Sequence, residues 1–326
     1  MDQKGYVISG LTFLLIIPTF ILIAVFVDIV HTGSETQSLG VQSDVTFYIA
    51  KDIEGNIPII TEKILQKTTN DVVKTGNPLM DSRNVIKNSL QEEVNHLSEK
   101  YQDNESINVT SKIWSVNPSP DPFKIEVNST IYVQKGSVAH NEHISQNISI
   151  MDSNYPIQDP LPFIKCKNYG GVTNTSTKIL YGSSLANLLK AENLTNADVY
   201  ENATSPLFIR KCPYDPYIWH GYSHSFIVLK NCVDNGYFHE SSDGSCFLCR
   251  LEGKATCSHY GFETFIVPSN SSSSSLMSAP CSIEHVIFAG YNIYPGKGIM
   301  YYSNSSKLFL DNGHRQKYGL PQYKDD

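Results

Sequence analysis

The sequence predicts an α+β protein that begins with a transmembrane helix. Three observations predict this class: an apolar run over residues 5–27, a change of hydrophobic period near residue 103, and the confinement of all 7 cysteines to residues 166–281. The period changes from about 3.6, typical of helices, to about 2, typical of strands. We therefore expect a transmembrane helix, amphipathic helices, an antiparallel β meander and then a Cys-rich, β-rich distal domain.

The apolar run over residues 5–27 reads GYVISGLTFLLIIPTFILIAVFV and contains no charged side chain. A helix needs about 20 apolar residues to cross the hydrocarbon core of a bilayer, so this run is long enough to span. A cleaved secretory signal has a shorter apolar region and a small-residue cleavage site, and no such site follows here. We expect a retained, single-pass anchor, because no other segment is as apolar.

The charges that flank the apolar run predict its orientation. Lys4 precedes the run, and the acidic Asp28 and Glu35 follow it. The positive-inside bias then puts residues 1–4 in the cytoplasm and the remainder outside the cell membrane. Acceptor sequences for N-glycosylation support an extracellular ectodomain, since they occur more often than the composition predicts. The candidates are Asn104, Asn108, Asn128, Asn147, Asn174, Asn193, Asn202, Asn270 and Asn304.

Lys4-Gly5 followed directly by an apolar helix resembles the entry to a pilin-type (class III) signal. The resemblance covers about residues 4–30. It implies cleavage on the cytoplasmic side, between Gly5 and Tyr6, which leaves the helix attached to the mature protein. It also implies that the partners are the membrane and other pilin-like subunits or cell-envelope components.

The remainder of this helix agrees with the resemblance at two positions and departs from it at one. Pro18 and the closing Asp28 resemble the anchors of Tad-type minor pilins and archaeal pilin-like proteins. Pilins usually carry Glu five residues after the cut, and this sequence has Gly10 there. The missing carboxylate argues against a major filament subunit. An ordinary anchor that starts with Lys-Gly is the alternative.

Residues 28–102 are predicted to form a helical stalk. Residues 31–42 are small and polar, which suits either a loop or a continuation of the first helix. Residues 58–75 are amphipathic, with Pro58 at a position that suits the start of a helix. Residues 82–101 give the clearest pattern, because apolar side chains recur there at helical spacing. These side chains are Ile86, Leu90, Val94, Leu97 and Tyr101, and Asp81 or Ser82 can cap the helix.

Residues 103–160 are predicted to form an antiparallel meander with one solvent-exposed face. Apolar and polar side chains alternate over 107–113, 123–133 and 144–150, and the proline-rich residues 117–122 mark the first turn. The glycosylation candidates Asn108, Asn128 and Asn147 fall on the polar positions of these strands. Helices followed by an antiparallel sheet are also the general plan of pilin-like ectodomains, which is an analogy of fold alone.

Residues 161–326 are predicted to form the Cys-rich, β-rich ectodomain. The prolines between 156 and 162 mark its boundary, and short β-like runs follow it. These runs are 225–233, 263–268, 284–290, 298–303 and 307–311. The domain contains Cys166, Cys212, Cys232, Cys246, Cys249, Cys257 and Cys281.

The cysteines allow two interpretations. Exported domains are usually stabilised by disulfides, and all 7 cysteines are candidates, with one thiol left over. In this interpretation Cys246 or Cys249 pairs with a cysteine further along the chain. The alternative is a zinc site, because three thiolates and an imidazole can bind Zn²⁺ tetrahedrally and C-x2-C is a common ligand spacing. Its ligands would be Cys246, Cys249, Cys257 and His259.

The function that the sequence predicts is adhesion, a role at a pilus tip, or another interaction at the cell envelope. The net charge of -7 argues against nucleic acid as a partner, because nucleic-acid binding depends on an excess of Lys and Arg. We find no G-x-S-x-G, H-E-x-x-H or phosphate-binding glycine loop, so no catalytic residue and no cofactor other than zinc is predicted. The alternative function is that of an envelope metalloprotein or enzyme that uses the Cys/His cluster.

Overall fold

The computed structural model describes residues 3–102, 106–151, 154–193, 197–215, 225–267, 280–289, 299–301, 306–308 and 312–318. The chain divides into two compact units. The first unit comprises Met1–Gly55, Asn95–Ser111 and Thr130–Glu142. The second unit comprises Asn56–Val94, Lys112–Ser129 and His143–Asp326.

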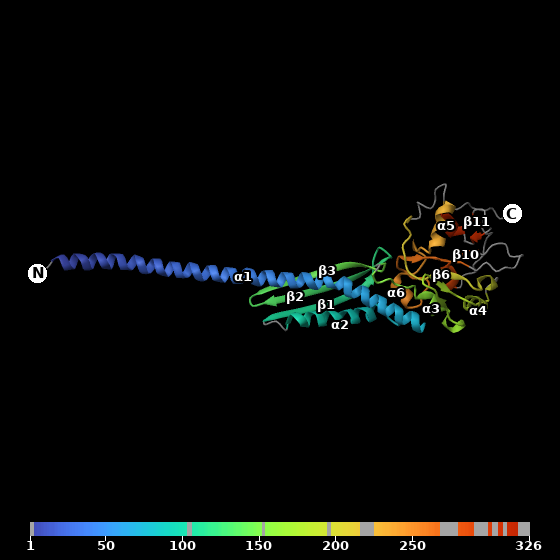
Figure 1. The fold of residues 1–326 in the computed structure, drawn as a ribbon, viewed down its shortest axis with the longest axis horizontal. Coiled ribbons are helices and arrows are strands. Elements are labelled where there is room, and N and C mark those ends of the chain that lie inside the picture. The colour runs from blue at the N-terminus through green and yellow to red at the C-terminus, as the bar shows by residue number, and fades with distance from the viewer. Residues whose placement is uncertain are drawn as a thin grey trace. The chain divides into compact units, whose positions relative to one another are not determined.

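The chain begins with one long helix, α1, which runs from Gln3 to Thr75 (Figure 1). Residues 31–42 therefore continue the helix and do not form a loop. The prediction that a helix begins at Pro58 is wrong, because Pro58 lies inside α1. Proline in a helix interior costs about 3 kcal/mol. The buried stripe of Ile53, Ile57 and Ile64 continues on both sides of the proline, so packing holds the helix through it.

The N-terminal part of α1 is apolar and exposed to its surroundings. Every side chain from residue 12 to residue 41 is exposed. An 18-residue window in this helix has a mean hydropathy of 2.8, and none of its residues is buried. Within the described residues, α1 is the one helix that is long and apolar enough to cross a membrane. It is therefore compatible with the predicted anchor.

Helix α2 spans Ser82–Gln102 and confirms the predicted helix over 82–101. Ile86, Leu90 and Val94 are fully buried, as the helical spacing predicts. The carboxylate of Asp81 caps the first turn, because its Oδ1 accepts a hydrogen bond of 3.0 Å from the backbone N–H of Asn84.

The meander is also confirmed. Its strands are β1 (Ile107–Pro118), β2 (Lys124–Lys135) and β3 (Val138–Ser149), in the order β1-β2-β3. β3 begins six residues earlier than predicted, because a tight turn at Gly136, with φ of 57°, follows β2 directly. Alternate side chains of β2 are buried, while Asn108 and Asn147 are exposed and Asn128 is half-buried. The predicted polar face is therefore the outer face of the sheet.

A pair of neighbouring residues in β2 tests this register. Val127 is fully buried, and Asn128 points to the opposite face. Burial of a valine side chain stabilises a fold by about 1.5–3 kcal/mol, and a buried, unpaired carboxylate costs more. We expect Val127→Asp to unfold the meander and Asn128→Gln to change the free energy of unfolding by less than about 0.5 kcal/mol. Urea titration followed by circular dichroism measures both, and equal tolerance would contradict the register.

The remainder of the second unit mixes short helices with short strands. The helices are α3 (Leu161–Lys165), α4 (Ser184–Ala191), α5 (Ser225–Asn235), α6 (Phe247–Leu251), α7 (Glu284–Phe288) and α8 (Asn312–Lys317). The strands are β4 (Thr173–Asn174), β5 (Lys178–Leu180), β6 (Thr204–Pro206), β7 (His239–Ser241), β8 (Gly261–Glu263), β9 (Phe265–Ile266), β10 (Pro280–Ile283), β11 (Ile299–Tyr301) and β12 (Ser306–Leu308). The sheet β11-β12-β10-β9 is mixed, because β10 and β12 are parallel.

Two of the predicted β-like runs are wrong. Residues 225–233 lie in α5, and residues 284–288 form α7. Leu229 and Cys232 are both fully buried, three residues apart, which is a helical spacing. A short apolar run does not distinguish a buried helix from a buried strand. The runs over 263–268, 298–303 and 307–311 do overlap strands, so this region is mixed and not predominantly β.

Candidate metal centre

The four predicted zinc ligands come from one short segment of the second unit. Cys246 has an extended backbone (φ -70°, ψ 162°) and immediately precedes α6, in which Cys249 lies. The chain then leaves the helix and returns Cys257 and His259 to the same place. The potential ligand atoms of all four residues lie within 4.8 Å of one another. The structure therefore brings together the set that the sequence predicts.

The distances within this cluster match those of a tetrahedral site. Zn–S bonds of about 2.3 Å and Zn–N bonds of about 2.0–2.1 Å place sulfur and nitrogen ligands about 3.5 Å apart when the angle at zinc is tetrahedral. The Nδ1 atom of His259 lies 3.7 Å from the Sγ of Cys246 and 3.6 Å from the Sγ of Cys249. The cluster thus has the spacing of a metal site.

The environment of Cys257 favours a thiolate, which is the form that binds metal. The side chains of Cys246 and then Cys249 hydrogen-bond to Cys257 and hold its pKa well below its ordinary value, and backbone N–H groups of Cys246 and His259 add to this effect. The backbone nitrogen of Cys246 lies 3.3 Å from the Sγ of Cys257. Three thiolates this close would repel one another, and a divalent cation would offset that repulsion.

The other nitrogen of His259 contacts a cation. Nε2 lies 2.8 Å from the Nη2 atom of Arg83. A guanidinium group only donates hydrogen bonds, so Nε2 accepts and Nδ1 carries the proton in the metal-free protein. Metal binding at Nδ1 would move that proton to Nε2. Arg83 would then have to turn away, while its positive charge would still offset the net negative charge of three thiolates and one divalent ion.

The disulfide interpretation remains a prediction. Among the residues whose side chains are described, six cysteines form no disulfide bond, and the side chain of Cys281 lies outside the described residues. Cys212 and Cys232 approach each other to 3.0 Å between their sulfur atoms, so they remain a candidate pair. Cys166 is buried in an apolar core, and burial raises the pKa of its thiol to about 12.

The glycosylation candidates that the structure describes have accessible positions. Asn108, Asn147, Asn174, Asn193 and Asn202 are exposed, and Asn128 is half-buried. Asn104, Asn270 and Asn304 lie outside the described residues. Gly5 and Tyr6, the residues of the predicted processing site, lie in the backbone of α1, and their side chains are not described.

Sequence reasoning missed a buried ionic network next to Cys249. Arg250 is fully buried and binds Asp159 through two hydrogen bonds, of 2.9 Å from Nε and 2.6 Å from Nη2. The Nη2 atom also lies 2.5 Å from a carboxylate oxygen of Glu284. One guanidinium group therefore serves two carboxyl groups, and burial raises the pKa of Glu284 to about 8. No local sequence pattern links these three residues.

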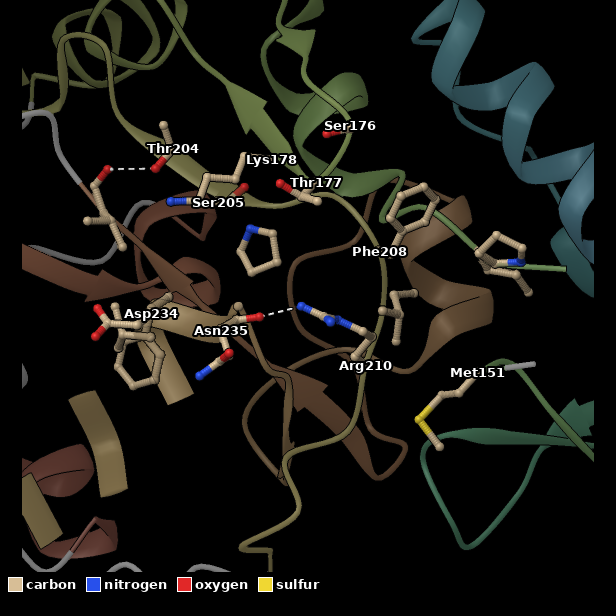
Figure 2. A pocket seen from close by; sticks show the side chains of 18 residues that line it. Met151, Ser176, Thr177, Lys178, Thr204, Ser205, Phe208, Arg210, Asp234 and Asn235 are labelled. Carbon is tan, nitrogen blue, oxygen red and sulfur yellow. Dashed lines mark hydrogen bonds between the residues drawn. The ribbon is translucent and has the colours of Figure 1, made fainter. Parts of the chain in front are cut away.

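A cavity of about 520 Å³ lies elsewhere in the second unit (Figure 2). Its wall combines apolar side chains, such as Phe208, with Lys178, Asp234 and Arg210. Arg210 donates a hydrogen bond to the backbone carbonyl of Asn235, which the figure shows as a dashed line. The volume is in the range of small-molecule sites, and the charges of its wall have mixed signs. This mixture indicates no particular ligand.

No family model matches this chain, and no curated protein or solved structure shows a significant similarity to it.

Proposed function

We propose that this protein is a single-pass, pilin-like surface protein that acts in adhesion, at a pilus tip or in another interaction at the cell envelope. The observation that carries this proposal is helix α1. Its exposed apolar part continues without interruption into a helix whose later residues, such as Ile57 and Leu65, are fully buried. The proposed membrane anchor and part of the buried core thus belong to one continuous helix.

The charge flanking the helix and the glycosylation candidates support an extracellular ectodomain. Lys4 precedes the apolar run and Asp28 follows it, which favours a cytoplasmic N-terminus. Exposed acceptor asparagines, such as Asn108 and Asn174, occur in both units of the chain. Glycans must project into solvent, so these positions suit an exported protein.

We also propose that the cluster of Cys246, Cys249, Cys257 and His259 holds a structural zinc ion. Four protein ligands complete a tetrahedron, and catalytic zinc sites keep one position open for water or substrate. This donor set therefore favours a structural metalloprotein over an enzyme acting through the same cluster. The zinc site and the surface function are compatible, because the metal would stabilise the domain that makes the interaction.

The orientation is testable on intact cells that produce the full chain. Protease added outside should degrade the chain beyond residue 31 and leave a membrane-protected fragment that contains the apolar N-terminal part of α1, residues 5–27. Mass spectrometry of the native protein should give a mature N-terminus at Tyr6 if the pilin-type signal is processed. A start at Met1 would leave an ordinary anchor, and a start beyond Val27 would mean a cleaved signal. Full protection from protease, with an accessible control protein degraded, would contradict the extracellular ectodomain.

A further inference from the structure

A second group of metal-ligating side chains lies in the second unit, apart from the cysteines. Glu263 ends β8, His285 lies in the first turn of α7, and His314 lies in α8. All three side chains are buried, and their potential ligand atoms lie within 4.8 Å of one another. Three elements that are separate in sequence therefore converge on one point.

The distances within this group fit ligands that share one cation. The Oε2 atom of Glu263 lies 3.6 Å from Nδ1 of His285 and 3.5 Å from Nε2 of His314. Hydrogen bonds between nitrogen and oxygen usually measure about 2.7–3.2 Å. Nitrogen and oxygen ligands at about 2.0–2.2 Å from zinc lie about 3.4 Å apart in a tetrahedral site. Within the described part of the chain, Nδ1 of His285 has no hydrogen-bond partner.

The carboxylate of Glu263 is held in place by neighbouring hydroxyl groups. Ser241 donates to Oε2 at 2.6 Å, and Tyr318 donates to Oε1 at 2.7 Å. Such contacts orient ligating carboxylates in metal sites, where partners beyond the ligands contribute strongly to affinity. The group therefore has both ligands and the contacts that position them.

Lys317 already forms an ion pair with the carboxylate that would bind the metal ion. Its Nζ lies 3.0 Å from Oε2 of Glu263, 3.0 Å from Oγ of Ser241 and 3.2 Å from Oδ2 of Asp243. The ammonium group keeps two acceptors if it withdraws from Glu263. Lys317 would therefore compete with a metal ion, because both positive charges interact with the same carboxylate.

We propose that Glu263, His285 and His314 bind a divalent first-row metal ion, with Lys317 as a built-in competitor. Two imidazoles and one carboxylate suit zinc or iron(II) more than calcium or magnesium. Three protein ligands leave at least one coordination position for water, in contrast to the four ligands of the cysteine site. The two sites therefore differ in the type of donor atom and in whether a coordination position is open to water.

The first test is metal stoichiometry of the purified full chain in detergent, saturated with Zn²⁺ and dialysed. We expect the wild type to hold one more zinc ion per chain than His314→Phe, which retains a ring of similar size. His96→Phe, an exposed change on α2, is the matched control and should hold as much zinc as the wild type. Equal zinc content in the wild type and in His314→Phe would overturn the proposal.

The second test uses the competitor and Co²⁺ as a spectroscopic probe. Cobalt bound to cysteine gives intense thiolate-to-metal charge transfer, and cobalt bound by nitrogen and oxygen gives only weak visible bands. Lys317→Met should strengthen Co²⁺ binding at the site of Glu263, His285 and His314 at least tenfold, as measured by the weak visible bands. The charge-transfer signal of the cysteine site should stay unchanged. Unchanged or weaker binding in Lys317→Met would overturn the proposal, whether or not His314→Phe folds.

Discussion

Removal of metal by a chelator is expected to unfold the segment over residues 246–259, whereas a reductant alone should leave it folded. The segment contains four potential ligands. Its regular secondary structure is little more than the short helix α6. Zinc contributes about 10–16 kcal/mol in isolated zinc-finger peptides, which equals or exceeds the total stability of most domains. Hydrogen exchange of peptides from this segment, with chelator or reductant added separately, measures the effect.

Two single substitutions distinguish the effect of losing the metal from the effect of losing any buried thiol. Cys257→Ser removes one ligand and should reproduce the effect of the chelator. Cys166→Ala removes a fully buried thiol that lies in an apolar core, and should cost only about 1 kcal/mol. The disulfide interpretation predicts the opposite response, with loosening by the reductant and none by the chelator. Seven free thiols in native, metal-free protein would refute both interpretations.

The parts of the fold that the sequence predicts well are long and strongly periodic. Helix α2 and strand β2 each carry a regular apolar pattern over many residues, so one period dominates the pattern. Residues 225–233 and 284–290 are short apolar runs, and α5 and α7 form there because burial in tertiary structure decides between helix and strand. The start predicted at Pro58 failed for a similar reason, since packing on both sides overrides the local preference.

The two proposed metal sites differ in how much of each could be predicted from the sequence. Cys246, Cys249, Cys257 and His259 lie within 14 residues, so local spacing alone indicates a common site. The group around Glu263 draws on residues from β8, α7 and α8, which only the tertiary fold brings together. The same is true of Arg250, whose partners are distant in sequence. The sequence signal for this network is one charged residue, Arg250, within the mainly apolar residues 246–251, and this signal does not identify its partners.

Replacement of Arg250 by methionine is expected to cost about 3–5 kcal/mol, the second largest effect among these predictions. Arg250 is fully buried and is bound to Asp159 and Glu284 at 2.5–2.9 Å. Methionine keeps much of the volume and removes the positive charge, so a buried carboxylate is left without its cation. Urea unfolding followed by circular dichroism at pH 7 measures the change in the free energy of unfolding.

Glu284→Gln is the matched control for this network. Burial first, and then the nearby charge of Asp159, raise the pKa of Glu284 to about 8 despite the opposing effect of Arg250. The carboxyl group is therefore mostly protonated at pH 7, and a single guanidinium group balances a single carboxylate, that of Asp159. Glutamine has the same shape and is neutral, so this substitution should change stability by less than about 1 kcal/mol. If Glu284→Gln proves as destabilising as Arg250→Met, then Glu284 is ionised in the folded protein and Arg250 balances two carboxylates instead of one.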